Sequence, residues 1–383
     1  MTKMSVLTLA MCAALSGAAQ GIAAFDPLMA ESQSIVDTNG VKWIDGKFLP
    51  LEGKAYADVE RFYDRLPANV TTNVNGGVRS MKHHSTGLQF RFRTDSPFLV
   101  VKLLTNAKSH AMYHMTECGV SGFDVYRRGA AGEPWRFVAS SHRADFVNPT
   151  TSERQKRIAW TPGSDCLINL PLYNGVASFA LGIAPKAKIE ALPPRANGVN
   201  RPVVFYGTSI THGGCASRPG LAFPSIVGRQ LDVPTVNLGF SGSGVMEFEM
   251  SEHLARIDAS CYVLDCLWNM GWGPTGRPGR RTDQNYEPFI RNLRAKRPDV
   301  PIIMAGRCDV FCNPPSLHEQ NVEKIFKKLK AEGWQNLYFL PCDGMLGSDF
   351  EGTVDGCHPN DIGMMHMARA YGEAVRKALW PAK

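Results

Sequence analysis

The sequence predicts a two-domain protein: an N-terminal all-β sandwich of the jelly-roll type, then an α/β domain on a five-stranded parallel, doubly wound sheet. Three observations support this. The chain has 383 residues, more than one hydrophobic core usually fills. Short apolar segments separated by Gly, Pro and Asn dominate the first half, whereas strand-like and helix-like segments alternate in the second. Hydrophobic residues make up 44% and charged residues 20%, as is typical of globular proteins.

Residues 1–24 have the pattern of a secretory signal peptide. Lys3 precedes an apolar run over residues 4–15, and small residues follow it. The run is shorter than the roughly 20 apolar residues that a membrane-spanning helix needs, and no other segment reaches that length. We therefore expect an exported protein, periplasmic or secreted, without membrane insertion. A lipid anchor is less favoured, because the bulky Met11 precedes Cys12 where a lipoprotein signal has a small residue.

Residues 25–184 contain the strands expected of the sandwich domain. Residues 88–93 alternate between apolar and polar, a turn follows, and residues 98–104 form a second apolar run, which together predict a hairpin. Strands at short, regular intervals are typical of a β-sandwich or jelly roll. Further short runs lie at 123–126, 135–138 and 177–183.

Residues 185–201 are rich in Pro, Lys, Ala and Asn, and we interpret them as the linker between the domains. Proline restricts the chain, so this linker is expected to be short and stiff. We therefore expect the sandwich to pack against the catalytic edge of the second domain and to help form its substrate site.

Residues 202–383 alternate strand-like and helix-like segments, which predicts parallel strands joined by right-handed crossovers, with helices on both faces. In such a sheet the carboxyl ends of the strands meet at one edge, where ligands bind. The predicted strands are 203–206, 235–238, 261–264, 302–305 and 337–340. The predicted helices are 222–231, 249–256, 285–296, 316–331 and 362–379.

Charge and spacing argue against several kinds of partner. The net charge of +7 is spread without a long basic run, so we predict no nucleic-acid binding. His110 and His114 have a metal-like spacing, but they lie in a strand-rich region and lack the Glu of a His-Glu-x-x-His motif. We therefore predict no metal site and no cofactor. The sequence does not specify an oligomeric state.

The chain has ten cysteines, of which Cys12 would leave with the signal peptide. The remaining nine cannot all pair. Candidate bridges join Cys308 to Cys312 and Cys342 to Cys357, and the spacing matches no zinc motif. We expect most of the other cysteines to be buried core residues.

A serine follows the first strand of the α/β domain. The apolar run 203–206 ends at Gly207, and Ser209 comes two residues later, so a tight turn would place Ser209 at the carboxyl edge of the sheet. Its hydroxyl would be placed to act as a nucleophile. The alternative is that Thr208, Ser209 and Thr211 only cap a helix or satisfy a turn.

Later strand ends carry the other groups that a serine nucleophile needs. Asp355 and His358 precede the last helix, close enough for the carboxylate to orient the imidazole that takes the serine proton. An Asp turn with a helix-capping histidine is the alternative. A glycine-rich stretch, 239–244, follows the second strand and Asn269 follows the third, and both offer donors for an oxyanion. Four strand ends thus carry Ser, Gly, Asn and Asp-x-x-His, which favours catalysis over unrelated turns.

This order resembles the SGNH (GDSL-like) hydrolase family, whose catalytic domain is flavodoxin-like. Gly207-Thr208-Ser209 stands where that family has Gly-Asp-Ser, and residues 267–270 read Leu-Trp-Asn-Met where it has Gly-x-Asn-Asp. Stretches at 84–87, 119–122, 170–176, 206–211 and 213–220 resemble the bacterial branch that carries an N-terminal β-rich domain. The resemblance implies catalysis by Ser209, Asp355 and His358, with the oxyanion held by the N–H groups of Ser209 and Gly242 (Gly239 as the fallback) and the amide of Asn269.

The resemblance implies a serine esterase, and export with an attached sandwich favours carbohydrate carrying O-acetyl or other small acyl groups as the substrate. Two alternatives stay open. One is a lipid or aryl-ester acylhydrolase. The other, suggested by the altered first and third blocks, is a glycan-binding protein with an inactive hydrolase domain. Candidate substrate contacts are Arg218, His212 and Trp268, each of which has a surface, core or turn role as its alternative.

Overall fold

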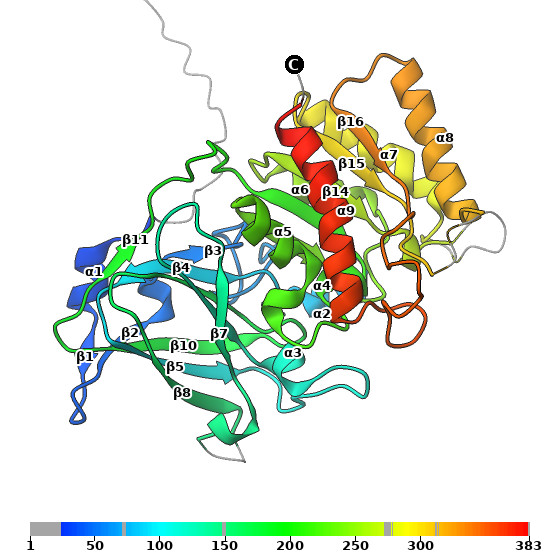
Figure 1. Ribbon diagram of the computed structural model, residues 1–383. Coiled ribbons are helices and arrows are strands. Elements are labelled where there is room, and N and C mark those ends of the chain that lie inside the picture. The colour runs from blue at the N-terminus through cyan, green and yellow to red at the C-terminus, as the bar shows by residue number, and fades with distance from the viewer. Residues whose placement is uncertain are drawn as a thin grey trace, which may run out of the picture.

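The computed structural model describes residues 24–381, apart from 71–73, 148–150, 272–276, 278, 311 and 313. The expected signal peptide lies almost wholly outside the described residues. A β-rich N-terminal domain and an α/β C-terminal domain lie side by side (Figure 1). Within the described part of the chain, no helix is both long and apolar enough to cross a membrane.

The N-terminal domain is a sandwich of two antiparallel sheets, as predicted. One sheet has the order β1 (Ile35–Val36), β2 (Lys42–Asp45), β10 (Val176–Ile183), β5 (Phe98–Thr105) and β8 (Glu153–Ala159). The other has the order β11 (Ile189–Ala191), β4 (Gln89–Thr94), β9 (Asp165–Asn169), β6 (Asp124–Arg128) and β7 (Arg136–Ser140), with β3 (Leu51–Glu52) beside β4. The short helix α1 (Pro27–Ser32) precedes β1, and α2 (Gly76–Met81) and α3 (Glu117–Ser121) each connect two strands.

Alternate side chains of the two sheets form the sandwich core. Leu99, Val101 and Leu103 of β5 are buried in one cluster with Phe90 and Phe92 of β4. Successive residues of a strand point to opposite faces, so every second residue is available for this contact.

The expected linker, residues 185–201, is partly structured. Ile189–Ala191 forms β11, which pairs with β4 and therefore belongs to the sandwich. These three residues contain no proline, so their N–H groups are available for the sheet. The proline-rich composition of the whole segment hid this short strand.

The α/β domain contains the predicted five-stranded parallel sheet. Its order is β13 (Thr235–Gly239), β12 (Val203–Gly207), β14 (Cys261–Asp265), β15 (Ile302–Ala305) and β16 (Leu337–Leu340). The first strand in sequence, β12, is therefore central, with β13 on one side and β14 on the other. The direction of chain progression reverses at β12, and such a switch point is where open α/β sheets bind ligands.

Helices cover both faces of this sheet. Val203 and Phe205 of β12 are buried in the cluster that includes α5 (Phe223–Leu231) and α9 (Asp361–Leu379). Val204 and Tyr206 point to the opposite face and are buried in the cluster that includes the other three long helices. Those helices are α6 (Phe248–Ala255), α7 (Thr282–Lys296) and α8 (Leu317–Ala331).

The two domains share hydrophobic cores. Leu66, Val70 and Val78 of the N-terminal domain are buried in the same cluster as α6, α7 and α8. On the other face of the catalytic sheet, Met115 and Leu172 are buried with α5 and α9. The sandwich domain is thus packed into the catalytic domain, in agreement with the close packing expected from a stiff linker.

Both predicted cysteine pairings are wrong. The structure pairs Cys312 with Cys342. These residues lie in the loops that follow β15 and β16, and because the two strands are parallel neighbours, their loops leave the sheet together. Cys308 is buried without a disulfide partner, and Cys357 is likewise unpaired.

Replacing Leu66 with Ala tests whether the two domains unfold together. Leu66 is fully buried in the core that both domains share, so the substitution should lower the free energy of unfolding by about 2 to 5 kcal/mol. Urea unfolding followed by circular dichroism should show one transition at a lower midpoint. Leu317→Ala is the control, because Leu317 is 65% exposed and should change stability by less than about 0.5 kcal/mol. Two separate transitions, with only one of them shifted, would contradict the shared core.

Candidate active site

Ser209 is the first residue of α4 (Ser209–His212), which begins directly after β12. Thr208 caps this short helix, since its side-chain oxygen accepts a hydrogen bond from the N–H of Ile210 at 3.2 Å. The capping role considered for the three hydroxyl residues thus falls to Thr208. This leaves the Ser209 hydroxyl free to meet another partner at the sheet edge.

Ser209, His358 and Asp355 form a continuous hydrogen-bonded chain. The Ser209 Oγ lies 2.9 Å from His358 Nε2, and His358 Nδ1 lies 2.8 Å from Asp355 Oδ2. The carboxylate accepts from Nδ1–H, so Nε2 carries the lone pair that can take the serine proton. The structure therefore brings together the three residues that the sequence proposed as a triad.

The Asp355 carboxylate is kept ionised by its hydrogen bonds. Burial acts to raise its pKa, but the N–H groups of His358 and Cys357, at 2.7 and 3.0 Å from Oδ1, together with the His358 ring lower the pKa below its usual value. An ionised Asp355 holds the imidazole in one tautomer and stabilises the imidazolium that forms during proton transfer.

The loops that carry Ser209 and His358 are bonded to each other. The N–H of Cys215 donates to the carbonyl of Pro359 at 2.8 Å. The N–H and hydroxyl of Ser217 donate to the Asp361 carboxylate at 2.8 and 2.5 Å. These bonds join the segment after the nucleophile to the segment after the base, and they fix the distance between the two groups.

Gly242, the predicted oxyanion donor, lies on the turn after β13. Its φ of 63° is in the left-handed region, it is exposed, and its N–H has no hydrogen-bond partner among the described residues. The N–H of Ser209, at the start of α4, likewise has no acceptor within the helix. Both N–H groups are therefore available to a developing negative charge.

The fallback donor, Gly239, is already engaged. Its N–H donates to the Asn237 side chain at 2.8 Å. A side chain at Gly239 would place Cβ 2.2 Å from the N atom of His212. Gly239 is thus needed for the close approach of α4 to β13, and Gly242 remains the candidate donor on this turn.

Asn269 ends the 3₁₀ turn Leu267–Asn269 that follows β14. Its side chain lies against the turn that carries Gly242. The amide orientation that satisfies its neighbours has Oδ1 accepting from the N–H groups of Ser243 and Gly244 at 3.0 and 3.1 Å. This orientation turns Nδ2 away from these two N–H groups. Asn269 thus braces the turn that carries Gly242, and its amide stays the predicted third oxyanion donor.

Arg65, from the N-terminal domain, binds the end of β13, directly before the turn that carries Gly242. The sequence did not predict this role of Arg65. Its buried guanidinium donates to the carbonyls of Asn237 and Gly239 at 3.0 and 2.9 Å, and to those of His84 and Met81 at 2.9 and 2.8 Å. Burial lowers its pKa to about 9, so it stays a cation at neutral pH. In the sequence Arg65 stands between Asp64 and Leu66, a context that gives no sign of its burial.

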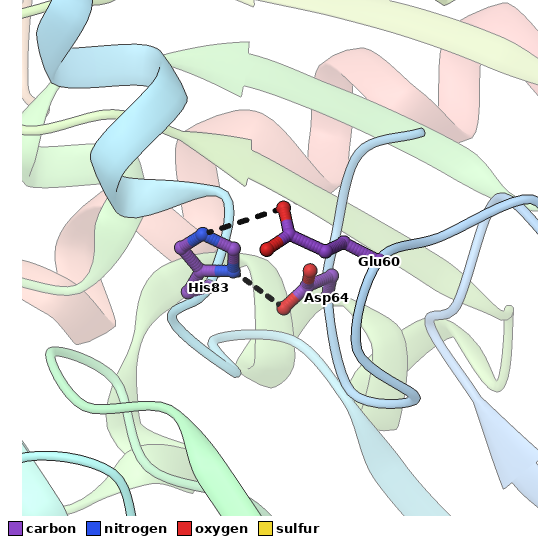
Figure 2. Close-up of side chains that lie close together, drawn as sticks. All are labelled: Glu60, Asp64 and His83. Atoms are coloured by element: carbon purple, nitrogen blue, oxygen red, sulfur yellow. Dashed lines mark hydrogen bonds and ion pairs between the residues drawn. The ribbon is translucent and has the colours of Figure 1, made fainter. Parts of the chain in front are cut away.

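A group of three potential metal ligands supports the segment that carries Arg65 (Figure 2). His83 Nδ1 lies 2.9 Å from Asp64 Oδ1, and His83 Nε2 lies 4.0 Å from Glu60 Oε2. The carboxylates have other partners, because Lys82 pairs with Glu60 at 2.9 Å and the N–H of Arg61 donates to Asp64 at 3.0 Å. We therefore interpret the cluster as an ion-pair network that orders residues 60–65.

His212, predicted as a substrate contact, is instead a buried structural residue. It is fully buried, and its Nε2 donates to the carbonyl of Leu172 at 2.8 Å. Tyr173 stacks on its ring at 4.1 Å and donates its own hydroxyl to the Ser209 carbonyl at 2.9 Å. The helix period of α4 turns His212 inward, and this is why a residue near the nucleophile in sequence does not face substrate.

Arg218 is also not placed as predicted, because it joins the two domains. Its guanidinium donates to the buried carboxylate of Asp124 at 2.8 Å and to the Tyr126 hydroxyl, and it lies over the Phe137 ring at 4.1 Å. The N–H of Gly220 donates to the same carboxylate at 2.8 Å. The loop after the nucleophile is thus held by the sandwich.

Trp268 lies half-buried beside Asn269. Its Nε1 donates to the Cys308 carbonyl at 2.5 Å, and the guanidinium of Arg307 lies 4.4 Å from its ring centroid. The exposed part of this ring keeps Trp268 a candidate substrate contact. Trp272, a second aromatic side chain of this loop, lies outside the described residues.

Comparisons with known proteins agree with this arrangement. Residues 200–376 match the GDSL-like Lipase/Acylhydrolase family, and residues 41–189 match GxDLY, described as the N-terminus of SGNH-hydrolase-type esterases. Residues 122–126 read Gly-Phe-Asp-Val-Tyr, which follows that name except for Val in place of Leu. They include the Asp124 and Tyr126 that bind Arg218. No curated protein matches the chain.

Solved structures share the two-domain architecture. A GDSL-like lipase from Bacteroides ovatus ATCC 8483 is 30% identical, and the match covers 88% of this chain and 98% of that chain with a TM-score of 0.73. The salicylyl-acyltransferase SsfX3 from a tetracycline biosynthetic pathway is 17% identical, with 91% and 100% covered and a TM-score of 0.68. A family two carbohydrate esterase from Clostridium thermocellum, in complex with cellohexaose, is 14% identical, with 77% and 93% covered and a TM-score of 0.54. The last two show a shared fold alone.

Asp265, at the end of β14, is a buried carboxyl group below the nucleophile helix. It is 3% exposed, and its Oδ2 accepts a hydrogen bond from the Thr211 hydroxyl at 2.7 Å. Burial raises its pKa to about 7. The folded protein therefore retains a proton on Asp265 at pH values where the unfolded chain has lost it.

Replacing Tyr173 with Phe tests how the sandwich supports the nucleophile. The Ser209 carbonyl would keep the N–H groups of Gly213 and Gly214 but lose the tyrosine hydroxyl. We expect kcat to fall about 5-fold and the free energy of unfolding to fall by about 1 kcal/mol, as for one lost hydrogen bond. Tyr63→Phe is the control, since the buried Tyr63 hydroxyl has no hydrogen-bond partner among the described residues. Equal kcat values for both variants would contradict the support role.

Replacing Asp265 with Asn should remove one component of the pH dependence of stability. The group's pKa is about 7 in the folded protein and about 3.9 in the unfolded chain, so its contribution to stability falls as pH rises from about 4 to about 7. The free energy of unfolding, measured with urea at pH 5 and pH 8, should therefore decrease more in the wild type than in Asp265→Asn. Identical decreases would show that Asp265 does not carry the proton.

Proposed function

The chain belongs to the GDSL-like lipase/acylhydrolase (SGNH hydrolase) family, and from this we propose a serine esterase that removes O-acetyl or other small acyl groups from carbohydrate. The observation that carries the esterase part is the Ser209–His358–Asp355 chain, with contacts of 2.9 and 2.8 Å. The family name describes lipases and acylhydrolases. Ester hydrolysis is therefore common to the carbohydrate, lipid and aryl-ester candidates.

The geometry supports acyl transfer in two steps. In the first step, His358 Nε2 takes the Ser209 proton while Oγ attacks the ester carbonyl, and the N–H groups of Ser209 and Gly242 with the Asn269 amide stabilise the oxyanion. His358 then gives the proton to the leaving alcohol as its C–O bond breaks. In the second step, water loses a proton to His358 and attacks the acyl-serine, which releases the acid and restores Ser209.

Two observations support carbohydrate as the alcohol. The chain shares its fold with a family two carbohydrate esterase solved with cellohexaose, over 93% of that protein. The pattern of residues 1–24 supports export, and we include a periplasmic or secreted location in the proposal. An exported hydrolase would meet extracellular polymers.

Hydrolysis of lipid or aryl esters is the second candidate, because apolar side chains are exposed on the loop that carries Asp355. Phe350 is 51% exposed and Val354 is 45% exposed. They precede the triad aspartate by one to five residues and would suit an apolar acyl chain or aryl group. Long-chain esters would then be hydrolysed faster than acetyl esters.

Labelling with a fluorophosphonate probe and acetate release together test the proposal. The probe should modify Ser209 in the wild type and not in Ser209→Ala, which should lose at least about 10³-fold in kcat because nucleophile and base act as one unit. Ser32→Ala, on the exposed α1 helix, is the control and should be labelled like the wild type. Acetate released from acetylated oligosaccharides should exceed fatty acid released from long-chain esters. A folded wild-type protein without an adduct on Ser209 would favour a glycan-binding protein with an inactive hydrolase domain.

A further inference from the structure

A loop of the sandwich domain reaches the catalytic histidine. The loop, residues 106–116, connects β5 to α3. It places the ring of His114 5.5 Å from the ring of His358, measured between centroids, with the planes at 70°. The N-terminal domain therefore contributes a side chain at the reaction centre itself.

Contacts at both ends hold this loop in place. Met115 is buried in the catalytic-domain cluster that includes Ile210 of α4, and the Thr116 hydroxyl donates to the carbonyl of Ser217. At the other end, the Asn174 side chain accepts from the N–H of Ala107 and donates to its carbonyl, both at 3.0 Å. These contacts anchor both ends of the loop that carries Tyr113 and His114.

Tyr113 stands at the tip of the loop and stacks on His114. The two rings lie 4.1 Å apart with planes at 23°, and Tyr113 is 94% exposed. The N–H of Met115 donates to the carbonyl of Met112 at 3.2 Å, which closes a tight turn around the pair. One face of the Tyr113 ring is thus covered by His114, and the other face is open to solvent.

The chemistry of the triad identifies which part of a substrate lies against these rings. The oxyanion donors face the carbonyl oxygen, whereas His358 must reach the oxygen of the leaving alcohol to protonate it. The alcohol therefore lies on the His358 side of the acyl group. His114 is an aromatic neighbour of His358, and Tyr113 stacks on His114.

We propose that Tyr113 and His114 form the subsite for the leaving alcohol and that they stack on a pyranose ring. The inference rests on the proposed function and assigns its sugar-binding surface. A flat, open aromatic face suits the C–H face of a sugar, because the hydroxyl groups at the ring edge stay in water.

His114 is suited to a position beside the base. Burial and the nearby His358 lower the pKa of His114, while Asp355 acts in the opposite direction. A neutral His114 adds no positive charge next to the imidazolium that forms on His358 during catalysis. It can therefore support Tyr113 without opposing the proton transfer.

The test uses the full chain and two acetate esters that differ only in the alcohol. One is a methyl glucopyranoside with a single O-acetyl group, and the other is ethyl acetate, which has no ring. Tyr113→Ala should lower the ratio of kcat/KM for the sugar ester to that for ethyl acetate by about 3- to 10-fold, mainly through KM. Tyr113→Phe keeps the ring and should restore the wild-type ratio. Phe248→Ala, an exposed aromatic on α6, is the control and should leave the ratio unchanged.

The outcomes separate this inference from the proposed function. If the wild type hydrolyses the sugar ester and Tyr113→Ala leaves the ratio unchanged, the subsite is wrong and the function stands. An equal loss on both esters would show a structural role and would also overturn the subsite. If the wild type hydrolyses ethyl acetate but no sugar ester, the carbohydrate part of the proposed function is wrong and the inference falls with it.

Discussion

The buried guanidinium of Arg65 is the interaction on which the geometry of the site most depends. A charge removed from water is costly unless its donors are satisfied, and here four backbone carbonyls accept them. Two of these carbonyls belong to the N-terminal domain and two to the end of β13. Because the cation requires all four, it ties the turn that carries Gly242 to residues 81–84 of the sandwich. The turn that carries the predicted oxyanion donor is therefore held by a residue from the other domain.

A second link between the domains operates on the opposite side of the nucleophile. Asp124 is fully buried and accepts from Arg218 and from the N–H of Gly220, so it holds the loop that follows Ser209. That loop in turn binds the segment after His358 through Ser217 and Asp361. The distance between nucleophile and base thus depends on a carboxylate of the sandwich. This gives a physical role to two of the residues in the Gly-x-Asp-Leu-Tyr motif.

The two domains consequently contribute different groups to the candidate active site. In the proposed mechanism, the α/β domain supplies the groups that act on the acyl carbon and its oxygen: Ser209, His358, Gly242 and Asn269. The sandwich supplies supports for that machinery and, through Tyr113 and His114, the proposed subsite for the leaving alcohol. A catalytic sheet of this kind serves many reactions, and specificity resides in what is added around its edge. Here the sandwich makes the principal addition.

The sequence by itself determined the architecture and the triad, because both follow from local patterns. A period of two residues marks strands, and a period of 3.6 residues marks helices. Parallel strands have their carboxyl ends at one edge of the sheet. The sequence therefore predicted that Ser209, Asp355 and His358 lie close together. Only the tertiary structure decided the disulfide, the burial of His212, the salt bridge of Arg218 and the positions of Arg65 and His114. Each of these depends on contacts between segments far apart in the chain, and which surfaces meet is set by packing between the domains. No local period encodes such contacts, since one arginine or histidine has the same sequence signal whether it is buried, paired or exposed.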